Sequence, residues 1–344
     1  MDRRTPPEPL SVADTRVRRL LERRAQHPAP PADPATDLVR GRARLDDLEP
    51  HQVPALWRRG GQVVLLPEPE EGRRDGSVET NLARKGMFVA GRRARPGGDQ
   101  LVLRVIASRD RLGEIRRVDE QGPALTEVEF VLSTSICTAW KALGDPYAVT
   151  IPITLTMFCR DLGWSDSGRN LQRVARGLSA LTQATFAGEV YDATTGELTM
   201  VHEFGLVQEW KAGRPNRAGA LGEVGFVMVT DWLRRQLAAD HQTYYSRELL
   251  RELRRPVAKL LLPWIEGERF EERTPQGGRI KRWPITRELF ASVGIGDSKP
   301  RQARVTLQRA GEEIVERDAS GRWVRIAVEQ TRARAWQLVA ERAA

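Results

Sequence analysis

One short motif occurs twice in the chain, and this repetition limits the possible folds more than any other feature. The heptapeptides PITLTMF, at 152–158, and PITRELF, at 284–290, share the pattern P-I-T-x-x-(M/L)-F and begin 132 residues apart. In each copy the Pro-Ile pair is expected to finish an extended segment, and Thr is a preferred N-cap of a helix. The apolar pair that ends the motif predicts the buried face of that helix. Two copies of one unit are therefore expected.

The residues that follow each motif also correspond in kind. Each short helix is expected to end at a glycine, Gly163 or Gly294, and an Asp-Ser pair follows at 166–167 and at 297–298. A longer helix then begins at Arg169-Asn170 in the first copy and at Arg301-Gln302 in the second, and each leads to a predicted hairpin with its turn at 192–196 or 318–321. Short helix, glycine turn, longer helix and hairpin form the order of a winged helix-turn-helix.

The longer helix of the second copy, predicted over 298–314, has one face suited to reading DNA. At about 100° per residue, small and aliphatic residues share one side and are expected in the core: Ala303, Leu307, Ala310 and Ile314. The other side, with Lys299 beside it, carries Ser298, Arg301, Gln302, Val305, Gln308 and Arg309. Arg suits guanine, Gln suits adenine, and an aliphatic group suits the thymine methyl. A helical hairpin with no role in DNA binding is the alternative, and it does not account for these faces.

The longer helix of the first copy, 168–183, presents a more uniform face. Its expected core consists of Leu171, Val174, Ala175, Leu178 and Leu181, whereas Arg169, Gln172, Arg173 and Arg176 point away. No acidic residue occurs between 168 and 183, although a solvated helix face normally mixes both signs. This face is expected to bind phosphates.

The two predicted hairpins differ in charge. Arg322 and Arg325 follow the second turn and are predicted to reach the phosphate backbone or a minor groove, while Trp323 between them is expected to pack in the core. The first hairpin is acidic, with Glu189, Asp192 and Glu197, and is a weaker candidate for DNA contact.

The chain changes character near residue 100. Residues 1–99 are rich in Arg and Pro, and we expect a flexible arm with a short helix at 12–25 and a strand at 63–66. Beyond it, strands are predicted at 101–106 and 115–118, and helices at 126–143 and 256–265, with Pro263 as a kink or stop. The predicted fold is α+β: a largely disordered segment 1–99, a first winged-helix domain at 100–225 and a second at 226–344.

Composition agrees with a nucleic-acid partner without requiring one. The formal net charge is +9, and such a field attracts polyanions, although abundant Arg also fits a GC-rich genome. Cys137 and Cys159 are expected to be buried free thiols in a reducing compartment. The N-terminus is charged, and no apolar run approaches the roughly 18 residues of a membrane span. We expect a cytoplasmic protein, associated with plasmid or nucleoid and not with a membrane.

The residue patterns of common catalytic sites are missing from the sequence. The four histidines are His27, His51, His202 and His241, and no two have the spacing of metal ligands. There is no phosphate-binding glycine loop. Tyr244-Tyr245 lacks the basic residues of a strand-transfer site and is read as part of a domain wall. We therefore expect no enzyme, no metal and no cofactor.

The region 101–344 resembles the Rep-type plasmid replication initiators that bind iterons, including the RepA-like and TrfA-like members. The resemblance rests on the P-I-T repeat and on the pattern L-x-x-L-x-x-P-x-A-K-L-L, which starts at Leu250, followed by Trp283-Pro284-Ile285-Thr286. It implies two tandem winged helices, of which the first dimerises and contacts backbone and the second reads sequence. It also implies double-stranded DNA with direct repeats at an origin, local melting, recruitment of host initiator and replicative helicase, and a homodimer in equilibrium with a monomer.

Two other functions fit the same residues. A transcriptional repressor with two winged helices needs only specific duplex binding, and an inverted repeat overlapping a promoter would favour it. A DNA recombinase or nicking enzyme is the third interpretation, which incubation with supercoiled plasmid and metal would test.

Overall fold

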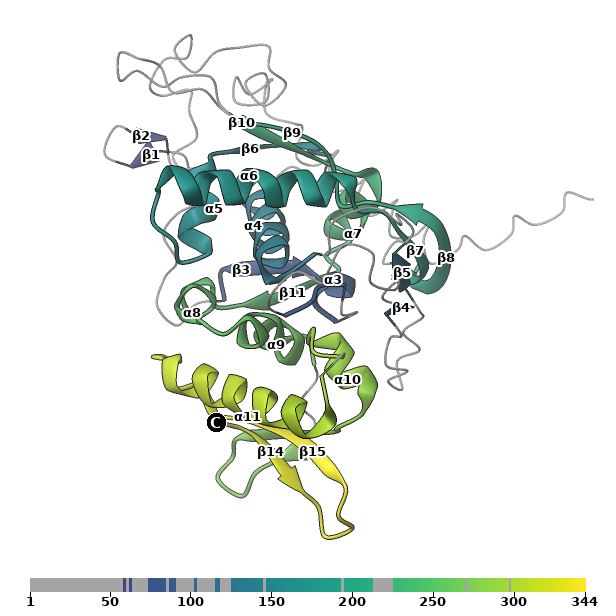
Figure 1. Cartoon of the computed structure of the whole chain (residues 1–344), viewed down its shortest axis with the longest axis vertical. Coiled ribbons are helices and arrows are strands. Elements are labelled where there is room, and N and C mark those ends of the chain that lie inside the picture. The colour runs from purple at the N-terminus through teal and green to yellow at the C-terminus, as the bar shows by residue number, and fades with distance from the viewer. Residues whose placement is uncertain are drawn as a thin grey trace, which may run out of the picture.

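The computed structural model describes residues 58–59, 62–63, 74–84, 87–90, 102–103, 115–117, 125–144, 147–192, 195–212, 225–268, 270, 272–296 and 298–344. These residues form a mixed α and β fold, as the sequence predicts. Figure 1 shows two bodies of helix and sheet, one around α6 and one around α11, with α8, α9, β3 and β11 between them.

The first unit begins with α4 (Glu127–Leu143), which confirms the helix predicted at 126–143. Thr126 and Glu129 form a capping box, in which the Glu129 carboxylate accepts a hydrogen bond from the Thr126 backbone N–H at 2.7 Å. The helix ends at Gly144, whose φ of 68° is the left-handed conformation that glycine adopts readily. The unit continues with β6 (Thr150–Ile153), α5 (Leu155–Asp161) and α6 (Gly168–Gln183).

Two hairpins follow α6, and they belong to different sheets. The first consists of β7 (Phe186–Asp192) and β8 (Glu197–Phe204), and it lies in a sheet of order β4-β5-β7-β8 with β4 (Val102–Leu103) and β5 (Ile115–Arg117). The second consists of β9 (Val207–Lys211) and β10 (Gly225–Val229), and β10 pairs antiparallel with β6. The predicted hairpin at 192–196 is present, but β9–β10 is the hairpin that pairs with β6. Local pattern could not show this, because β5 and β6 select their partners by tertiary pairing.

The second unit repeats the helix, strand, short helix, longer helix and hairpin of the first, with one hairpin after the longer helix in place of two. It begins with α9 (Pro256–Glu266), which confirms the predicted helix and continues past Pro263. The strands and helices that follow are β12 (Glu272–Arg273), β13 (Arg279–Pro284), α10 (Arg287–Ser292), α11 (Pro300–Arg317), β14 (Trp323–Gln330) and β15 (Trp336–Arg342). Their sheet has the order β12-β13-β15-β14. The strand before the short helix therefore pairs with the last strand of the unit, β15, as β6 pairs with β10.

The repeated motif performs the same structural task in both units. The Thr154 hydroxyl accepts a hydrogen bond from the Met157 N–H, and the Thr286 hydroxyl from the Leu289 N–H, each at 3.2 Å. The apolar pair that ends each motif is buried in each unit. The turns that follow contain Gly163 and Gly294, with φ of 72° and 77°. The caps, the buried pairs and the glycine turns confirm these predictions. The hairpin turn predicted at 318–321 is wrong, because these residues join α11 to β14 and the β14–β15 hairpin turns at 331–335.

The start of α11 differs from the prediction. The helix begins at Pro300, so Ser298 and Lys299 precede it and the face predicted from 298 is two residues shorter. Proline favours the first turn because its missing N–H has no helical acceptor there. The predicted core face is confirmed, since Ala303, Leu307, Ala310 and Ile314 are fully buried.

A segment of the predicted N-terminal arm lies in the core. The strand β3 (Gly76–Glu79) pairs antiparallel with β11 (Gln242–Tyr245), and α3 (Thr80–Arg84) follows it. Val78, Leu82 and Phe88 are almost completely buried. The expectation of one flexible region over 1–99 is therefore wrong for 74–84 and 87–90. The segment is too short to show a period, and its partner strand lies far along the chain.

The other N-terminal elements are small. In the described part, β1 (Arg58–Arg59) and β2 (Gln62–Val63) form an antiparallel pair. Val63 of the strand predicted at 63–66 lies in β2, and 64–66 lie outside the described residues. The helix predicted at 12–25 lies outside the described residues. The connection between the units contains α7 (Asp231–Ala238), β11 and α8 (Arg247–Glu252). Within the described residues, no helix combines the length and the apolar character needed to cross a membrane.

Candidate nucleic-acid interface

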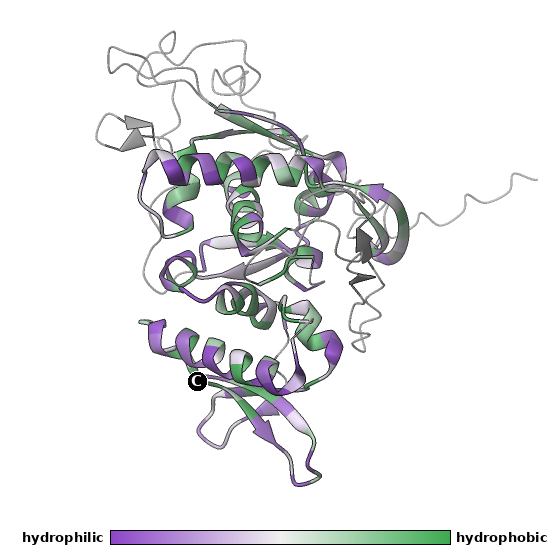
Figure 2. Ribbon diagram, viewed as in Figure 1, coloured by the Kyte–Doolittle hydropathy of each residue, from purple (hydrophilic) through white to green (hydrophobic). Residues whose placement is uncertain are grey.

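The outer side of α11 carries exposed residues near its N-terminus. Arg301, Gln302 and Arg309 are exposed, and none has a hydrogen bond or ion pair with a residue that the structure describes. Val305 lies among them with 45% of its surface exposed, and Lys299 is exposed at the start of the helix. An unpaired cation, a free amide and an aliphatic group thus share one surface. Figure 2 shows hydrophilic and hydrophobic segments alternating along α11, as in an amphipathic helix.

Two residues predicted for this surface have other roles in the structure. The side-chain Oε1 of Gln308 accepts a hydrogen bond from the Val328 backbone N–H at 2.5 Å, and its side-chain Nε2 donates one to the Glu312 carboxylate at 2.7 Å. Gln308 therefore joins α11 to β14, and its amide is not free to pair with a base. Ser298 is half-buried in the turn before the helix, where its N–H donates to the Ile295 carbonyl at 3.1 Å.

Arg304 was not among the residues predicted to contact DNA, but it lies beside this surface. Its guanidinium lies over the Trp336 ring, 4.6 Å from the ring centroid. A planar cation held on an aromatic face keeps its charge and loses less conformational freedom on binding. The sequence shows that Arg304 lies three residues after Arg301, about one helical turn away. Its stacking partner, Trp336 of β15, is known only from the fold.

The outer side of α6 is more uniform. Arg169, Gln172, Arg173 and Arg176 are all exposed, as predicted. The Arg173 guanidinium lies over the Trp164 ring at 4.0 Å from the centroid. Ser167 caps the helix by accepting a hydrogen bond from the Asn170 N–H at 3.4 Å. The three arginines therefore lie on one exposed side of a helix that has no acidic residue.

The arginines of the second hairpin separate into two environments. Arg322 donates a hydrogen bond to Glu266 at 3.1 Å, so it contributes to the fold at the base of the hairpin. Arg325 is exposed on β14 and forms an ion pair with Glu329. Trp323 is buried at 3% exposure, in agreement with the packing role predicted for it. The structure thus leaves Arg325 on the surface and directs Arg322 inward.

Two buried carboxylates attach the N-terminal segment to the second unit. Glu266 forms ion pairs with Arg74 at 3.1 Å and with Arg342 at 2.9 Å, in addition to Arg322. Burial lowers the pKa of Arg342 to about 10, with Glu266 opposing the change. Glu268 pairs with Arg84 and, at 2.6 Å, with Lys281. Burial by itself raises the pKa of Glu268, but Arg84 and Lys281 outweigh it and lower that pKa below its ordinary value.

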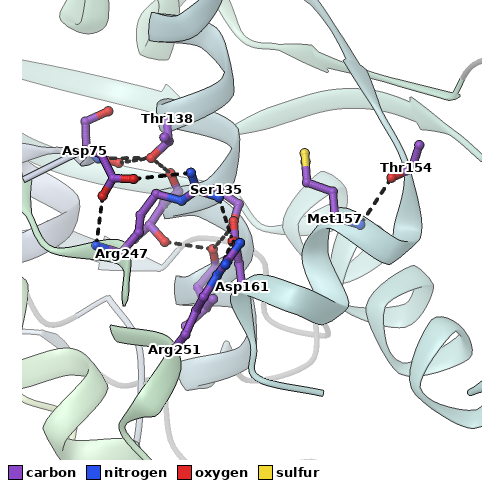
Figure 3. A network of polar contacts seen from close by, with 11 residues as sticks. Asp75, Ser135, Thr138, Thr154, Met157, Asp161, Arg247 and Arg251 are labelled. Carbon is purple, nitrogen blue, oxygen red and sulfur yellow. Dashed lines mark hydrogen bonds and ion pairs between the residues drawn. The ribbon is translucent and has the colours of Figure 1, made fainter. Parts of the chain in front are cut away.

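A third carboxylate, Asp161, joins the first unit to α8 in the connection between the units (Figure 3). Its Oδ1 accepts hydrogen bonds from Arg247 at 2.9 Å and from Arg251 at 2.8 and 3.1 Å, while its Oδ2 accepts one from the Ser135 hydroxyl at 2.6 Å. Asp75 of the N-terminal segment accepts a hydrogen bond from the Arg247 backbone N–H at 3.2 Å. Burial raises the pKa of Asp75, and Arg247 opposes the change. These polar groups hold α8 and the N-terminal segment against α4 and α5 of the first unit.

Both cysteines are buried and free, and burial raises the pKa of the Cys137 thiol to about 12. Tyr245 is buried in the core, and Tyr244 donates a hydrogen bond to Asp240 at 2.5 Å. Among the described residues, no group of three or more His, Cys, Asp or Glu side chains is placed to hold a metal ion.

The described chain thus belongs to the class of α and β proteins with a duplicated helix–strand–helix–helix–hairpin unit. No family model matches it, and no curated protein matches it in sequence. Among solved structures, it is similar to a selenomethionine derivative of domains 2 and 3 of RctB, with 12% identity and a TM-score of 0.49, over 77% of this chain and 98% of that one. A second structure of RctB domains 2-3 has 8% identity and a TM-score of 0.44, over 75% and 96%.

Proposed function

We propose that the chain initiates replication of a plasmid by binding direct repeats at an origin through two winged-helix units. The observation that carries this proposal is the outer side of α11. There Arg301 and Gln302, at the start of the longer helix, and Arg309, in its middle, are exposed without a partner among the described residues. In the same unit the strand before the short helix pairs with the last strand. In a winged helix, the N-terminal residues of that helix contact base edges in the major groove.

The two units have different tasks in this proposal. The second unit reads sequence, because α11 offers Arg301 for guanine, Gln302 for adenine and Val305 for a thymine methyl. The first unit anchors the protein, because the arginines of α6 can bind phosphates as readily as bases. Arg325 on β14 adds a contact to the phosphate backbone. Gln308 and Arg322 are not assigned to DNA, since the fold already uses their polar groups.

The further steps of initiation follow from the family resemblance and are proposed with it. They are local melting of an AT-rich segment, recruitment of the host initiator and the replicative helicase, and an equilibrium between a homodimer and the monomer that initiates. The chain supplies no catalytic step of its own in this scheme. Supercoiled plasmid incubated with the protein and Mg²⁺ is therefore expected to remain unnicked, and nicked product would show that this part of the scheme is wrong.

Selection of bound sequences from random duplexes tests the proposal. The selected sequence is expected to occur as direct repeats beside an AT-rich tract in the DNA that carries the gene. Affinity for it is expected to fall with salt, by about 0.9 in log K per unit of log salt for each phosphate contacted. A slope near zero would contradict DNA binding altogether. An inverted repeat overlapping a promoter would identify a repressor instead.

A further inference from the structure

A cavity of about 540 Å³ lies where the two units meet. Its wall comes from the turn after α5, from the end of α8 and the residues that follow it, and from α9 and the end of α11. Four cationic residues line it, namely Arg251, Arg254, Lys259 and Arg317, against the single carboxylate of Glu252. Both units therefore contribute to a cavity whose wall is strongly positive.

Two of these cations have incomplete electrostatic compensation. Lys259 is only 6% exposed, and its ammonium donates a hydrogen bond to the Leu162 carbonyl at 3.0 Å. No ion pair in the described part of the chain includes it, and burial lowers its pKa, with Glu127 and Glu313 opposing from longer range. The Arg317 Nε is buried and has no hydrogen-bond partner among the described residues. A buried charge without a counter-charge and a buried donor without an acceptor are both costly, and a bound anion would remove both costs.

The other two arginines differ in how firmly they are held. Arg251 is fixed by its hydrogen bonds to Asp161, so it presents a preorganised edge to the cavity. Arg254 is exposed, and only its backbone N–H is used, in a 2.6 Å hydrogen bond to Glu313. The arginine fork matches the geometry of phosphate oxygens, and several cations around one cavity suit a group with more than one negative charge.

We propose that this cavity binds a phosphate group. The phosphate comes from the DNA backbone or from a small phosphorylated compound, and both sources offer the same oxygens to the cavity. The cavity wall includes Trp164, and the Arg173 guanidinium of α6 lies over the ring of this tryptophan. The cavity therefore borders the basic side of α6, and a strand that binds this side can continue into it. The DNA source rests on the function proposed above, whereas the small-molecule source does not.

Calorimetric titration of the full-length protein with pyrophosphate tests the cavity without DNA. The informative variant is Arg254→Gln with Arg317→Gln, because neither side chain forms an ion pair within the described residues. The matched control is Arg235→Gln with Arg273→Gln, which removes two exposed arginines that do not line the cavity. Pyrophosphate affinity is expected to fall at least about tenfold in the first variant and to stay unchanged in the control, because charge-assisted hydrogen bonds are lost.

Salt-dependent DNA binding by the same variants distinguishes the sources. A slope of log K against log salt that becomes shallower by about 0.9 per lost contact identifies a backbone phosphate, whatever the pyrophosphate result. An unchanged slope together with the tenfold loss for pyrophosphate identifies a small phosphorylated ligand. Equal pyrophosphate affinity and equal slopes in both variants and the natural chain would overturn the proposal. If the natural chain does not bind DNA at all, the pyrophosphate titration still decides on the cavity, while the proposed function fails separately.

Discussion

The outer sides of α6 and α11 differ although the two units share one pattern of caps, glycine turns and buried positions. The exposed side of α6 has three arginines and no carboxylate along the helix. The exposed side of α11 starts with Arg301, Gln302 and Val305, and it becomes acidic at Glu312 and Glu316. A helix needs only its buried side to keep its place in the fold. The duplicated scaffold therefore permits one copy to present uniform charge and the other a mixture of groups.

The units also differ in how they hold the N-terminal segment. Towards the first unit, the Ser77 N–H donates to the Thr138 hydroxyl at 2.9 Å, and that hydroxyl lies 3.2 Å from the Ser77 carbonyl. Towards the second unit, Arg74 and Arg84 pair with the buried carboxylates of Glu266 and Glu268. One attachment is neutral and the other is ionic. The two attachments and the two helix surfaces can each be tested by mutation.

The largest effect is expected from deletion of the segment that both units share. A chain that starts at Gln100 lacks Val78, Leu82 and Phe88, and loss of each such buried side chain costs about 2–5 kcal/mol. Since a domain is stabilised by only about 5–15 kcal/mol, this chain is expected to lose its cooperative urea transition. A chain that starts at Gly72 is the control, and it should unfold as the full chain does. Equal urea midpoints for the two shortened chains would show that the segment is dispensable.

The second effect concerns the ionic attachment. Glu268→Gln is expected to lower the free energy of unfolding at pH 7, because it leaves Arg84 and Lys281 without their buried counter-charge. The folded-state pKa of Glu268 is lowered, so its contribution is complete above the unfolded pKa of about 4.3 and is lost as pH falls through the folded pKa.

Urea unfolding at a series of pH values measures this contribution. The difference between the natural chain and Glu268→Gln should shrink as the pH falls below about 4.3. Thr138→Val removes the neutral attachment, and its destabilisation should not follow this dependence. A difference for Glu268→Gln that is the same at pH 7 and at pH 3 would contradict the ionic account.

The third effect concerns base reading by α11. Arg301→Ala is expected to weaken binding to the selected duplex by about 1–3 kcal/mol and to relax preference at one base pair. Binding to scrambled duplex should fall less. The measurement is a titration on both duplexes at two salt concentrations. If the loss is equal on both, Arg301 contacts only phosphate.

The smallest effect is expected for α6. Arg173→Ala should weaken binding to selected and scrambled duplexes alike and reduce the salt slope by about 0.9, as expected for one phosphate contact. The same titrations measure it beside Arg301→Ala. If Arg173→Ala erodes discrimination and Arg301→Ala does not, the tasks of the two units are reversed.

Features with a local physical cause were predicted well from the sequence. The caps at Thr154 and Thr286, the long helix α4 and the buried side of α11 each depend on residues within a few positions of one another. The exposure of Arg169 in α6 and of Arg301 in α11 follows from their angle around the helix alone. Both residues lie on the surface, as predicted.

Features that depend on distant partners were not predictable in this way. Arg322 and Arg325 look equivalent in sequence, yet only Arg322 meets Glu266, which lies on another element. Gln308 has the right angle for an outward face, but Val328 of β14 provides a backbone donor for it. The residues of β3 form a strand by pairing with β11, which lies far along the chain, so their own sequence did not predict it. In each case the missing information is a tertiary pairing.

The pairing of β3 with β11 also has a consequence for biosynthesis. The residues of β3 leave the ribosome roughly 160 residues before those of β11, which at about 5–20 residues per second is a delay of about 10–30 s. During that time β3 has no partner strand and the side of α3 that packs on α9 is uncovered, although α4 can already cover part of the segment through contacts such as Phe88 with Phe130. The nascent chain must therefore keep an apolar segment in solution while the first unit emerges. We expect this interval to be the stage at which the growing chain is most prone to aggregation and most dependent on chaperones.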